Sequence, residues 1–282
     1  MENRYAPDVH NGYFIAMKKV LSRLSPAIVI VSLLVIWELV VRIADLPVYL
    51  LPSPTKIFSA MIADLPTLLY HSGVTVLEAL IGMAISFVVA VVVGILMDMF
   101  PAFKRSIYPI LVVTQTIPVI VLAPILIIYM GFGWGPKILT VVLMCFFPVV
   151  VSFSDGLSQM DESYINLIRT YGGSRLQLYR IVKLPAAFIA LLSGLKVAAT
   201  YSISGAVVGE WIASGSGLGY YLIRAKNNYL LDKVFASVVV IIILSLLMNG
   251  LVRLCGRIAL PQAAGLTSKT RKKHGRIRRP LN

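Results

Sequence analysis

The chain has 282 residues, of which 58% are hydrophobic and 13% are charged. Soluble domains carry about 25% charged residues, so this composition excludes an ordinary soluble globular protein and indicates a membrane protein. Lys and Arg together number 26 against 12 Asp and Glu, which gives a net charge of +14. The positions of these charges along the chain therefore carry information about its orientation.

Six runs are long and apolar enough to cross a bilayer, whose core of about 30 Å needs roughly 20 helical residues. They cover residues 26–44, 79–97, 106–130, 138–154, 186–209 and 234–252. None alternates polar and apolar residues with a period of two, as strands of a membrane barrel do. The first run follows a basic leader, but its length favours a retained helix over a cleaved signal peptide. The sequence thus predicts an all-α membrane protein with six transmembrane helices.

The distribution of basic residues predicts the orientation, because Lys and Arg beside membrane helices favour the cytoplasmic side. With the N-terminus inside, 19 of them lie on the cytoplasmic side and six on the other. We therefore expect a cytoplasmic segment at residues 1–25, a transmembrane domain at 26–258 and a basic cytoplasmic tail at 259–282. Such a tail is typical of contact with an anionic lipid bilayer. No aromatic or fold-level feature supports nucleic-acid binding.

The third run carries three prolines, and the middle one, Pro118, follows three polar residues: Thr114, Gln115 and Thr116. Carbonyl groups freed by a proline inside a membrane must find partners within the protein. One interpretation is a helix that lines a cavity, which makes these four residues candidates for a translocation path. The other is a kinked structural helix whose threonines bond their own backbone.

Four charged residues lie in the runs or at their edges: Glu38, Glu78, Lys196 and Glu210. Each is a functional candidate, because a charge inside a bilayer costs roughly 2.5–3.5 kcal/mol. Lys196 and Glu210 join the path candidates, and the small residues before Glu210 also favour close helix packing. For Glu78 we expect a side chain that reaches water at the outer surface.

The sequence contains no cluster typical of catalysis or metal binding. His10, His71 and His274 are scattered outside the runs, and Cys145 and Cys255 have no metal or disulfide spacing. The phosphate-binding pattern G-x-x-x-x-G-K-[ST] is absent from the sequence. We therefore expect no metal, no bound cofactor and no ATP hydrolysis by this chain. A self-sufficient secondary transporter or an intramembrane enzyme stays an alternative, although no internal repeat or ion relay supports it.

The longest cytoplasmic loop in this topology, residues 155–185, has the pattern of an amphipathic helix with a glycine break. Apolar residues share one face before Gly172 and Gly173: Tyr164, Leu167, Ile168 and Tyr171. The pattern resumes at Leu178, Ile181, Val182 and Pro185. Such a helix fits a groove on a partner protein. It equally fits the surface of the inner leaflet, and spacing does not separate the two.

This segment resembles the cytoplasmic loop of ATP-binding-cassette importer permeases. The family pattern is Glu-Ala-Ala, three residues, Gly, nine residues, Ile, any residue and Leu-Pro. Asn166, Leu167 and Ile168 stand at its first three positions, followed by Gly172, Val182, Leu184 and Pro185. The spacing matches throughout, whereas the opening triplet departs from the pattern. The resemblance implies a loop that contacts the ATPase through Asn166, Leu167, Ile168, Arg169, Gly172, Gly173, Arg175, Leu184 and Pro185.

Four further motifs extend the resemblance: "WEL" at 37–39, "LPSP" at 51–54, "FFPVVV" at 146–151 and "VVGEW" at 207–211. They are similar to the subgroup that imports sulfonates, taurine, nitrate and vitamin-related pyrimidines. The resemblance implies a type I importer permease fold, a homodimer and the plasma membrane of a bacterium or archaeon. It also implies separate ATPase subunits that use ATP and Mg, and an extracytoplasmic solute-binding protein.

Two stretches, "TQTIPVIVLAP" and "GFGWGPK", bear on the substrate of the subgroup. Their resemblance favours a thiamine-precursor pyrimidine or a riboflavin-like cargo. Aliphatic sulfonate, taurine or nitrate comes next.

Overall fold

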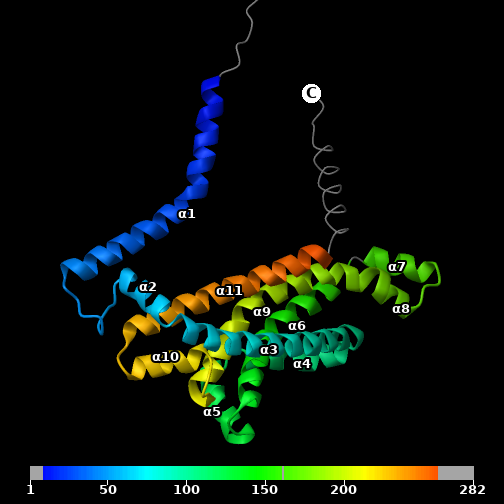
Figure 1. Ribbon diagram of the computed structural model, residues 1–282. Helices are drawn as coiled ribbons and strands as arrows, with labels where there is room; N and C mark the ends of the chain where they lie inside the picture. Colours follow the sequence, from blue (N-terminus) through cyan, green and yellow to red (C-terminus); the bar gives the residue numbers. More distant parts are fainter. Residues whose placement is uncertain (1–8, 161, 260–282) are drawn as a thin grey trace, which may run out of the picture. The chain divides into compact units, whose positions relative to one another are not determined.

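The computed structural model describes residues 9–160 and 162–259, and these residues form helices without a strand (Figure 1). The prediction of an all-α protein is confirmed for this part of the chain. Residues 1–8 and most of the expected basic tail lie outside the described residues. The helices are α1 Val9–Ile43, α2 Pro54–Ala63, α3 Leu65–Met99, α4 Pro101–Thr114, α5 Val119–Met130, α6 Trp134–Ser158, α7 Glu162–Thr170, α8 Arg175–Leu178, a π-helical turn Tyr179–Lys183, α9 Leu184–Ala213, α10 Leu218–Asn227 and α11 Leu231–Ala259.

Five of these helices are long and apolar enough to cross a membrane, and α4 with α5 makes a sixth span if the bent pair counts as one. The six predicted runs correspond to α1, α3, the α4–α5 pair, α6, α9 and α11. The helices extend beyond the runs, so Lys137 lies inside α6 and His71 lies inside α3. The expectation that His71 stands outside the membrane helices was therefore wrong.

The third run is broken rather than continuous, because α4 and α5 meet at an angle of 101°. Pro118 precedes α5 and lacks an N–H for a helical hydrogen bond. The hydroxyl of Thr114 donates to the Leu111 carbonyl at 2.9 Å, and that of Thr116 to the Val113 carbonyl at 2.7 Å. The threonines thus bond their own backbone, as in one of the two interpretations, but the helix is interrupted and not merely kinked.

The described part of the chain divides into two compact units, residues 9–64 with 225–236 and residues 65–224 with 237–259. In the first unit, Ser53 caps α2: its Oγ accepts a hydrogen bond from the Lys56 N–H at 3.4 Å, and Pro54 opens the helix. The Glu38 carboxylate accepts hydrogen bonds from the Thr55 N–H at 3.0 Å and the Thr55 hydroxyl at 2.8 Å. These bonds attach the start of α2 to α1.

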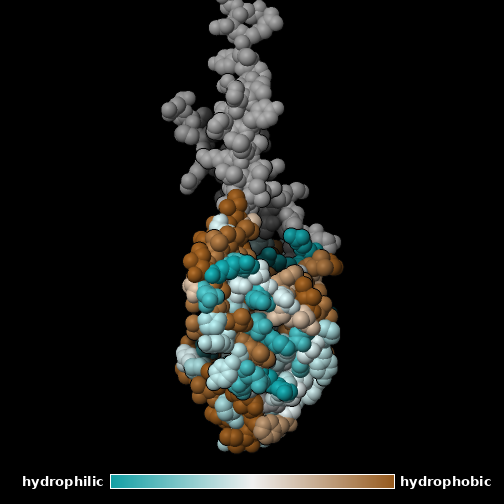
Figure 2. All heavy atoms as spheres, turned by 60° about the vertical axis from the view of Figure 1, so that its left-hand side comes forward, coloured by the Kyte–Doolittle hydropathy of each residue, from teal (hydrophilic) through white to brown (hydrophobic). Residues whose placement is uncertain are grey.

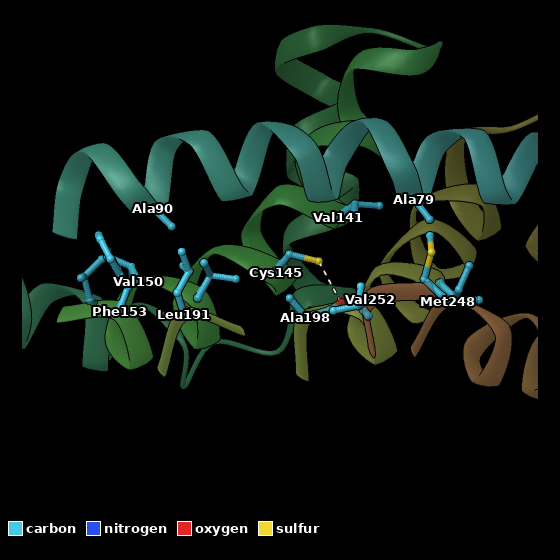
Figure 3. Close-up of a cluster of buried hydrophobic side chains, with 14 of the residues drawn as sticks. Ala79, Ala90, Val141, Cys145, Val150, Phe153, Leu191, Ala198, Met248 and Val252 are labelled. Carbon is cyan, nitrogen blue, oxygen red and sulfur yellow. Dashed lines mark hydrogen bonds between the residues drawn. The ribbon is translucent and has the colours of Figure 1, made fainter. Parts of the chain in front are cut away.

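The core of the second unit forms where α6 packs against α9 and α3. Figure 3 shows side chains from these helices and from α11 meeting in one apolar cluster, with the Cys145 thiol directed at the Ala198 carbonyl at 3.3 Å. A Cβ on Gly82 would lie 2.5 Å from Cβ of Val141. Only glycine allows α3 and α6 to approach so closely at this point, which is how membrane helices commonly pack.

Large apolar side chains are also exposed on many helices, and they show as brown areas on the face in Figure 2. Val31 and Leu33 on α1 are more than half exposed, as are Leu246 and Leu247 on α11. Soluble monomers rarely expose large continuous apolar surfaces. These surfaces fit contact with lipid.

Candidate functional site

The segment that resembles the importer loop begins with α7, which ends in a glycine turn. Gly172 has φ +71, a conformation that L side chains rarely adopt. Its N–H donates to the Arg169 carbonyl at 3.0 Å, and the Gly173 N–H donates to the Ile168 carbonyl at 2.8 Å. This pair of bonds is the Schellman motif, which satisfies the last carbonyls of a helix. The turn therefore fixes the direction in which the chain leaves α7.

A second helix starts directly after this turn, with Ser174 as its N-cap. The Ser174 N–H donates to Oε1 of Gln177 at 2.7 Å, and the Gln177 N–H donates to Oγ of Ser174 at 3.3 Å. This reciprocal arrangement is a capping box. From here α8, the π-helical turn and α9 continue without a break, so Leu184 and Pro185 belong to a helix rather than a loop. The helix that follows the glycine turn is therefore continuous with a membrane span.

The apolar face predicted for α7 is largely exposed. Tyr164 is 58% exposed, Leu167 is 52% exposed and Tyr171 is 84% exposed, whereas Ile168 is half-buried. Asn166 and Arg169 are exposed on the same helix. Exposed aromatic and aliphatic side chains on a short helix are typical of a protein-binding surface.

The segment is held to the end of α3 by Asp98, a residue that the sequence analysis did not select. Lys183 Nζ lies 2.6 Å from Oδ2 of Asp98, and the Tyr179 hydroxyl donates a hydrogen bond to the same oxygen. The Asp98 and Lys183 side chains are 7% and 14% exposed, so little water screens the pair. Both donors come from the π-helical turn, a distortion that often occurs at functional sites.

A second cluster of charged residues is buried between α3, α6 and α9. Glu78, with its side chain fully buried, forms an ion pair with Lys137, which is 4% exposed. Lys137 Nζ also donates to the Ser214 hydroxyl at 3.2 Å. The expectation that Glu78 reaches water was wrong, because Lys137 lies in α6 and brings its charge to the buried carboxylate.

Glu210 lies beside this pair and holds the turn between α9 and α10. Its carboxylate accepts hydrogen bonds from the Thr75 hydroxyl at 2.7 Å and the Gly219 N–H at 2.6 Å. The Thr75 oxygen in turn accepts from the Leu218 N–H at 2.9 Å, and the Gly217 N–H donates to Nδ1 of His71 at 3.0 Å. A carboxylate at the first residues of α10 also interacts favourably with the helix dipole.

The path candidates from the sequence do not form one site. Thr114, Gln115, Thr116 and Pro118 are exposed at the break between α4 and α5. Glu210 is 1% exposed, and its carboxylate accepts the hydrogen bonds from Thr75 and Gly219 described above. Lys196 lies in the middle of α9, where its carbonyl accepts a bond from Asn249 at 3.4 Å. No hydrogen bond or ion pair between described residues joins the three places.

Comparison with known proteins gives the family. Residues 82–258 match the model of the "Binding-protein-dependent transport system inner membrane component" family. A probable ABC transporter permease of Haemophilus influenzae is 35% identical over 79% of this chain and 91% of its own length. The formylaminopyrimidine transport permease protein ThiX of Halalkalibacterium halodurans is 35% identical over 87% of this chain and 98% of its own length.

The fold agrees with a solved structure of inward-facing MetNI, a methionine ABC transporter. The TM-score is 0.58 at 18% identity, covering 65% of this chain and 92% of that chain. The chain belongs to the binding-protein-dependent transport system inner membrane component family, and it is the permease subunit of an ABC importer. It is a membrane transport component and not an enzyme, as the sequence resemblance implied.

Proposed function

We propose that this permease couples ATP hydrolysis by two partner ATPase subunits to import through α7. The observation that carries the proposal is the exposed apolar face of Tyr164 and Leu167 on α7, continued by Tyr171 in the turn at Gly172. Because residues 175–213 are continuously helical, a displacement of α7 is transmitted to α9. The Asp98 contacts carry the same displacement to α3.

The paired permeases of a homodimer then alternate between inward and outward openings, and ATP and the loaded binding protein both bias this equilibrium. ATP and Mg are used by the partner, so this chain needs no cofactor of its own. Asn166, Leu167, Ile168, Arg169, Gly173 and Arg175 complete the surface offered to the ATPase, with Leu184 and Pro185 at the start of the span.

The break between α4 and α5 supports a place for the translocation path. Discontinuous helices in transporters expose backbone groups where they line a cavity. Thr114, Gln115, Thr116 and Pro118 occupy this break, and Gln115 offers a donor and an acceptor to a polar solute. We propose that Lys196 and Glu210 lie at the edges of the translocation path. Glu210 contributes by holding the turn between α9 and α10 in place.

The formylaminopyrimidine permease relative supports a thiamine-precursor pyrimidine as the first substrate to test. A riboflavin-like compound is the second candidate, followed by aliphatic sulfonate, taurine and nitrate. Uptake of labelled formylaminopyrimidine should be measured in cells that express the permease with its ATPase and binding protein. Competition by the unlabelled pyrimidine and not by taurine or sulfonate supports this assignment. Competition by taurine or sulfonate and not by the pyrimidine overturns it.

The proposed orientation, with both termini in the cytoplasm, can be tested by labelling a cysteine of the chain. Cys255 near the end of α11 is exposed, whereas Cys145 is buried in the core. A maleimide that does not cross membranes should label Cys255 in inside-out vesicles and leave right-side-out vesicles unlabelled. Labelling only in right-side-out vesicles would reverse the topology. A Cys255→Ser variant shows how much of the signal comes from Cys145.

The ATPase contact is tested by placing a charge on the α7 face. We expect Leu167→Asp to reduce co-purification of the ATPase about tenfold or more, because burying a leucine contributes about 1.5–3 kcal/mol. Thr170→Asp is the matched control, since Thr170 is exposed on the same helix but lies off the apolar face. Unchanged assembly and unchanged substrate-stimulated ATP turnover in Leu167→Asp would contradict the coupling role.

A further inference from the structure

A pocket of about 810 Å³ opens between the end of α3 and the segment that follows α7. Its size lies within the range of about 300–1,000 Å³ that small-molecule sites occupy. The translocation path does not use this pocket, and neither do the exposed apolar residues Tyr164, Leu167 and Tyr171. The lining does share Ile168, Arg169, Gly173, Arg175 and Leu184 with the surface proposed for the ATPase. It is lined on one side by the turn of α7 into α8 and on the other by the last residues of α3.

The wall of the pocket is strongly basic. Arg169, Arg175 and Arg180 all line it, and none of them makes an ion pair with a carboxylate among the described residues. The acidic residue of the lining, Asp98, already pairs with Lys183. Among the described residues, the lining of the pocket therefore carries more positive than negative charge. Guanidinium groups present paired donors that match the oxygens of a phosphate.

The lining also has an apolar part, with Ile95 and Met99 from α3 and Leu176, Leu178 and Leu184 from the other side. Met99 is the last residue of a membrane span, so the pocket lies where the apolar part of that span ends. A ligand that matches both linings carries an anionic group and an adjoining hydrocarbon chain. Basic pockets at the cytoplasmic end of membrane helices suit lipid headgroups of this kind.

We propose that this pocket binds an acidic phospholipid of the inner leaflet, with the phosphate beside Arg175 and Arg180 and an acyl chain along Ile95 and Met99. The proposal rests on the cytoplasmic orientation proposed above. Because Tyr164, Leu167 and Tyr171 do not line the pocket, they stay available to the ATPase when the lipid is bound. The bound lipid contacts both α3 and the coupling segment and thereby stabilises their relative position.

The test uses the permease–ATPase complex in nanodiscs made either of phosphatidylglycerol or of phosphatidylcholine. After extraction into detergent, native mass spectrometry counts the phospholipids that stay bound. We expect phosphatidylglycerol to be retained and phosphatidylcholine to be lost. Arg180→Gln should lower retention of phosphatidylglycerol roughly fivefold. One basic residue near an anionic headgroup contributes about 1 kcal/mol, which corresponds to about fivefold in affinity. Arg175→Gln combined with Arg180→Gln should abolish it.

Arg257→Gln is the matched control, since Arg257 is an exposed basic residue at the end of α11 and does not line the pocket. Equal retention of the two lipids, or equal loss in Arg257→Gln, overturns the proposal. Displacement of the lipid by millimolar inorganic phosphate also overturns it, because the site would then select free phosphate. ATPase co-purification is measured in the same samples. If the ATPase still co-purifies but the two lipids are retained equally, the lipid site alone is refuted. If the ATPase does not co-purify with the unmodified permease, the coupling role is refuted.

Discussion

The Lys183 ammonium lies 2.6 Å from the Asp98 carboxylate and joins the start of the α9 span to the end of α3. The two residues are 85 positions apart in the sequence, and both side chains are largely shielded from water. An ion pair in this environment is screened far less than one at the surface. It is therefore suited to keep two spans in a fixed relation while an attached helix moves.

Asp98→Asn is expected to weaken transport more than ATP hydrolysis. The amide keeps the size of the side chain but loses the charge that holds Lys183, so movement of α7 reaches α3 less completely. We expect the ratio of substrate imported to ATP hydrolysed to fall roughly fivefold, within the range of allosteric coupling energies. Measuring both rates in proteoliposomes checks this. Asp98→Glu keeps the charge and should retain most of the coupling, and an unchanged ratio in Asp98→Asn would exclude the transmitting role.

Lys137→Met is expected to destabilise the fold, because it leaves the Glu78 carboxylate buried without its cation. Removing one partner of a buried ion pair costs about 3–5 kcal/mol in free energy of unfolding. Adding Glu78→Leu should recover a large part of this loss. Thermal unfolding of the detergent-solubilised protein measures both effects. Lys233→Met is the comparison, since its pair with Asp64 is partly exposed and contributes about 0–1 kcal/mol.

The effect of replacing Gly172 on ATPase assembly should depend on which side chain is introduced. Gly172→Val is expected to lose ATPase assembly, because φ +71 costs a side chain with a branched Cβ about 1–2 kcal/mol or more. Gly172→Asn should retain more assembly, since asparagine tolerates this conformation better than other residues. Gly250→Ala provides the control: it lies inside α11, and an added Cβ meets no atom within 4 Å. Equal loss in the Val and Asn variants would argue against a conformational cause.

Thr75→Val is expected to loosen the turn between α9 and α10. The substitution keeps the shape of the side chain but removes the donor to Glu210 and the acceptor for the Leu218 N–H. Hydrogen exchange at Leu218 and Gly219 should accelerate by roughly tenfold, because a hydrogen bond to a charged group contributes about 1.5–3 kcal/mol. Thr75→Ser keeps the hydroxyl and should exchange slowly. Protection that persists in the valine variant would show that the turn is held by other contacts.

Much of the coupling segment could be predicted from the sequence because its signals are local. The spacing of Tyr164, Leu167 and Tyr171 predicts one face of a short helix, and the pair Gly172–Gly173 predicts its end. The structure has α7 end at Thr170 and the turn at Gly172. The structure also shows that Gln177 completes a capping box with Ser174. The pattern S-x-x-Q at this point was a readable signal.

The buried charges could not be predicted in the same way. Glu78 and Lys137 are 59 residues apart, and hydropathy placed Lys137 in an outer loop because the apolar run begins after it. Asp98 was not predicted as a site residue, because a single acidic residue directly after a membrane run is common at the membrane surface. Which cation meets which carboxylate depends on how the helices cross, and the close packing at Gly82 is part of that crossing.

The sequence by itself determined that the protein is an all-α membrane protein, the number of membrane runs and the amphipathic segment, because hydropathy, helical periodicity and glycine turns act over a few residues. Tertiary structure alone decided that the third run breaks between α4 and α5, that Asp98 holds Lys183 and that Glu210 holds the turn before α10. The physical reason is that ion pairs and hydrogen bonds between helices depend on distances of a few ångström between residues far apart in the chain. Those distances are set only when the helices pack against one another.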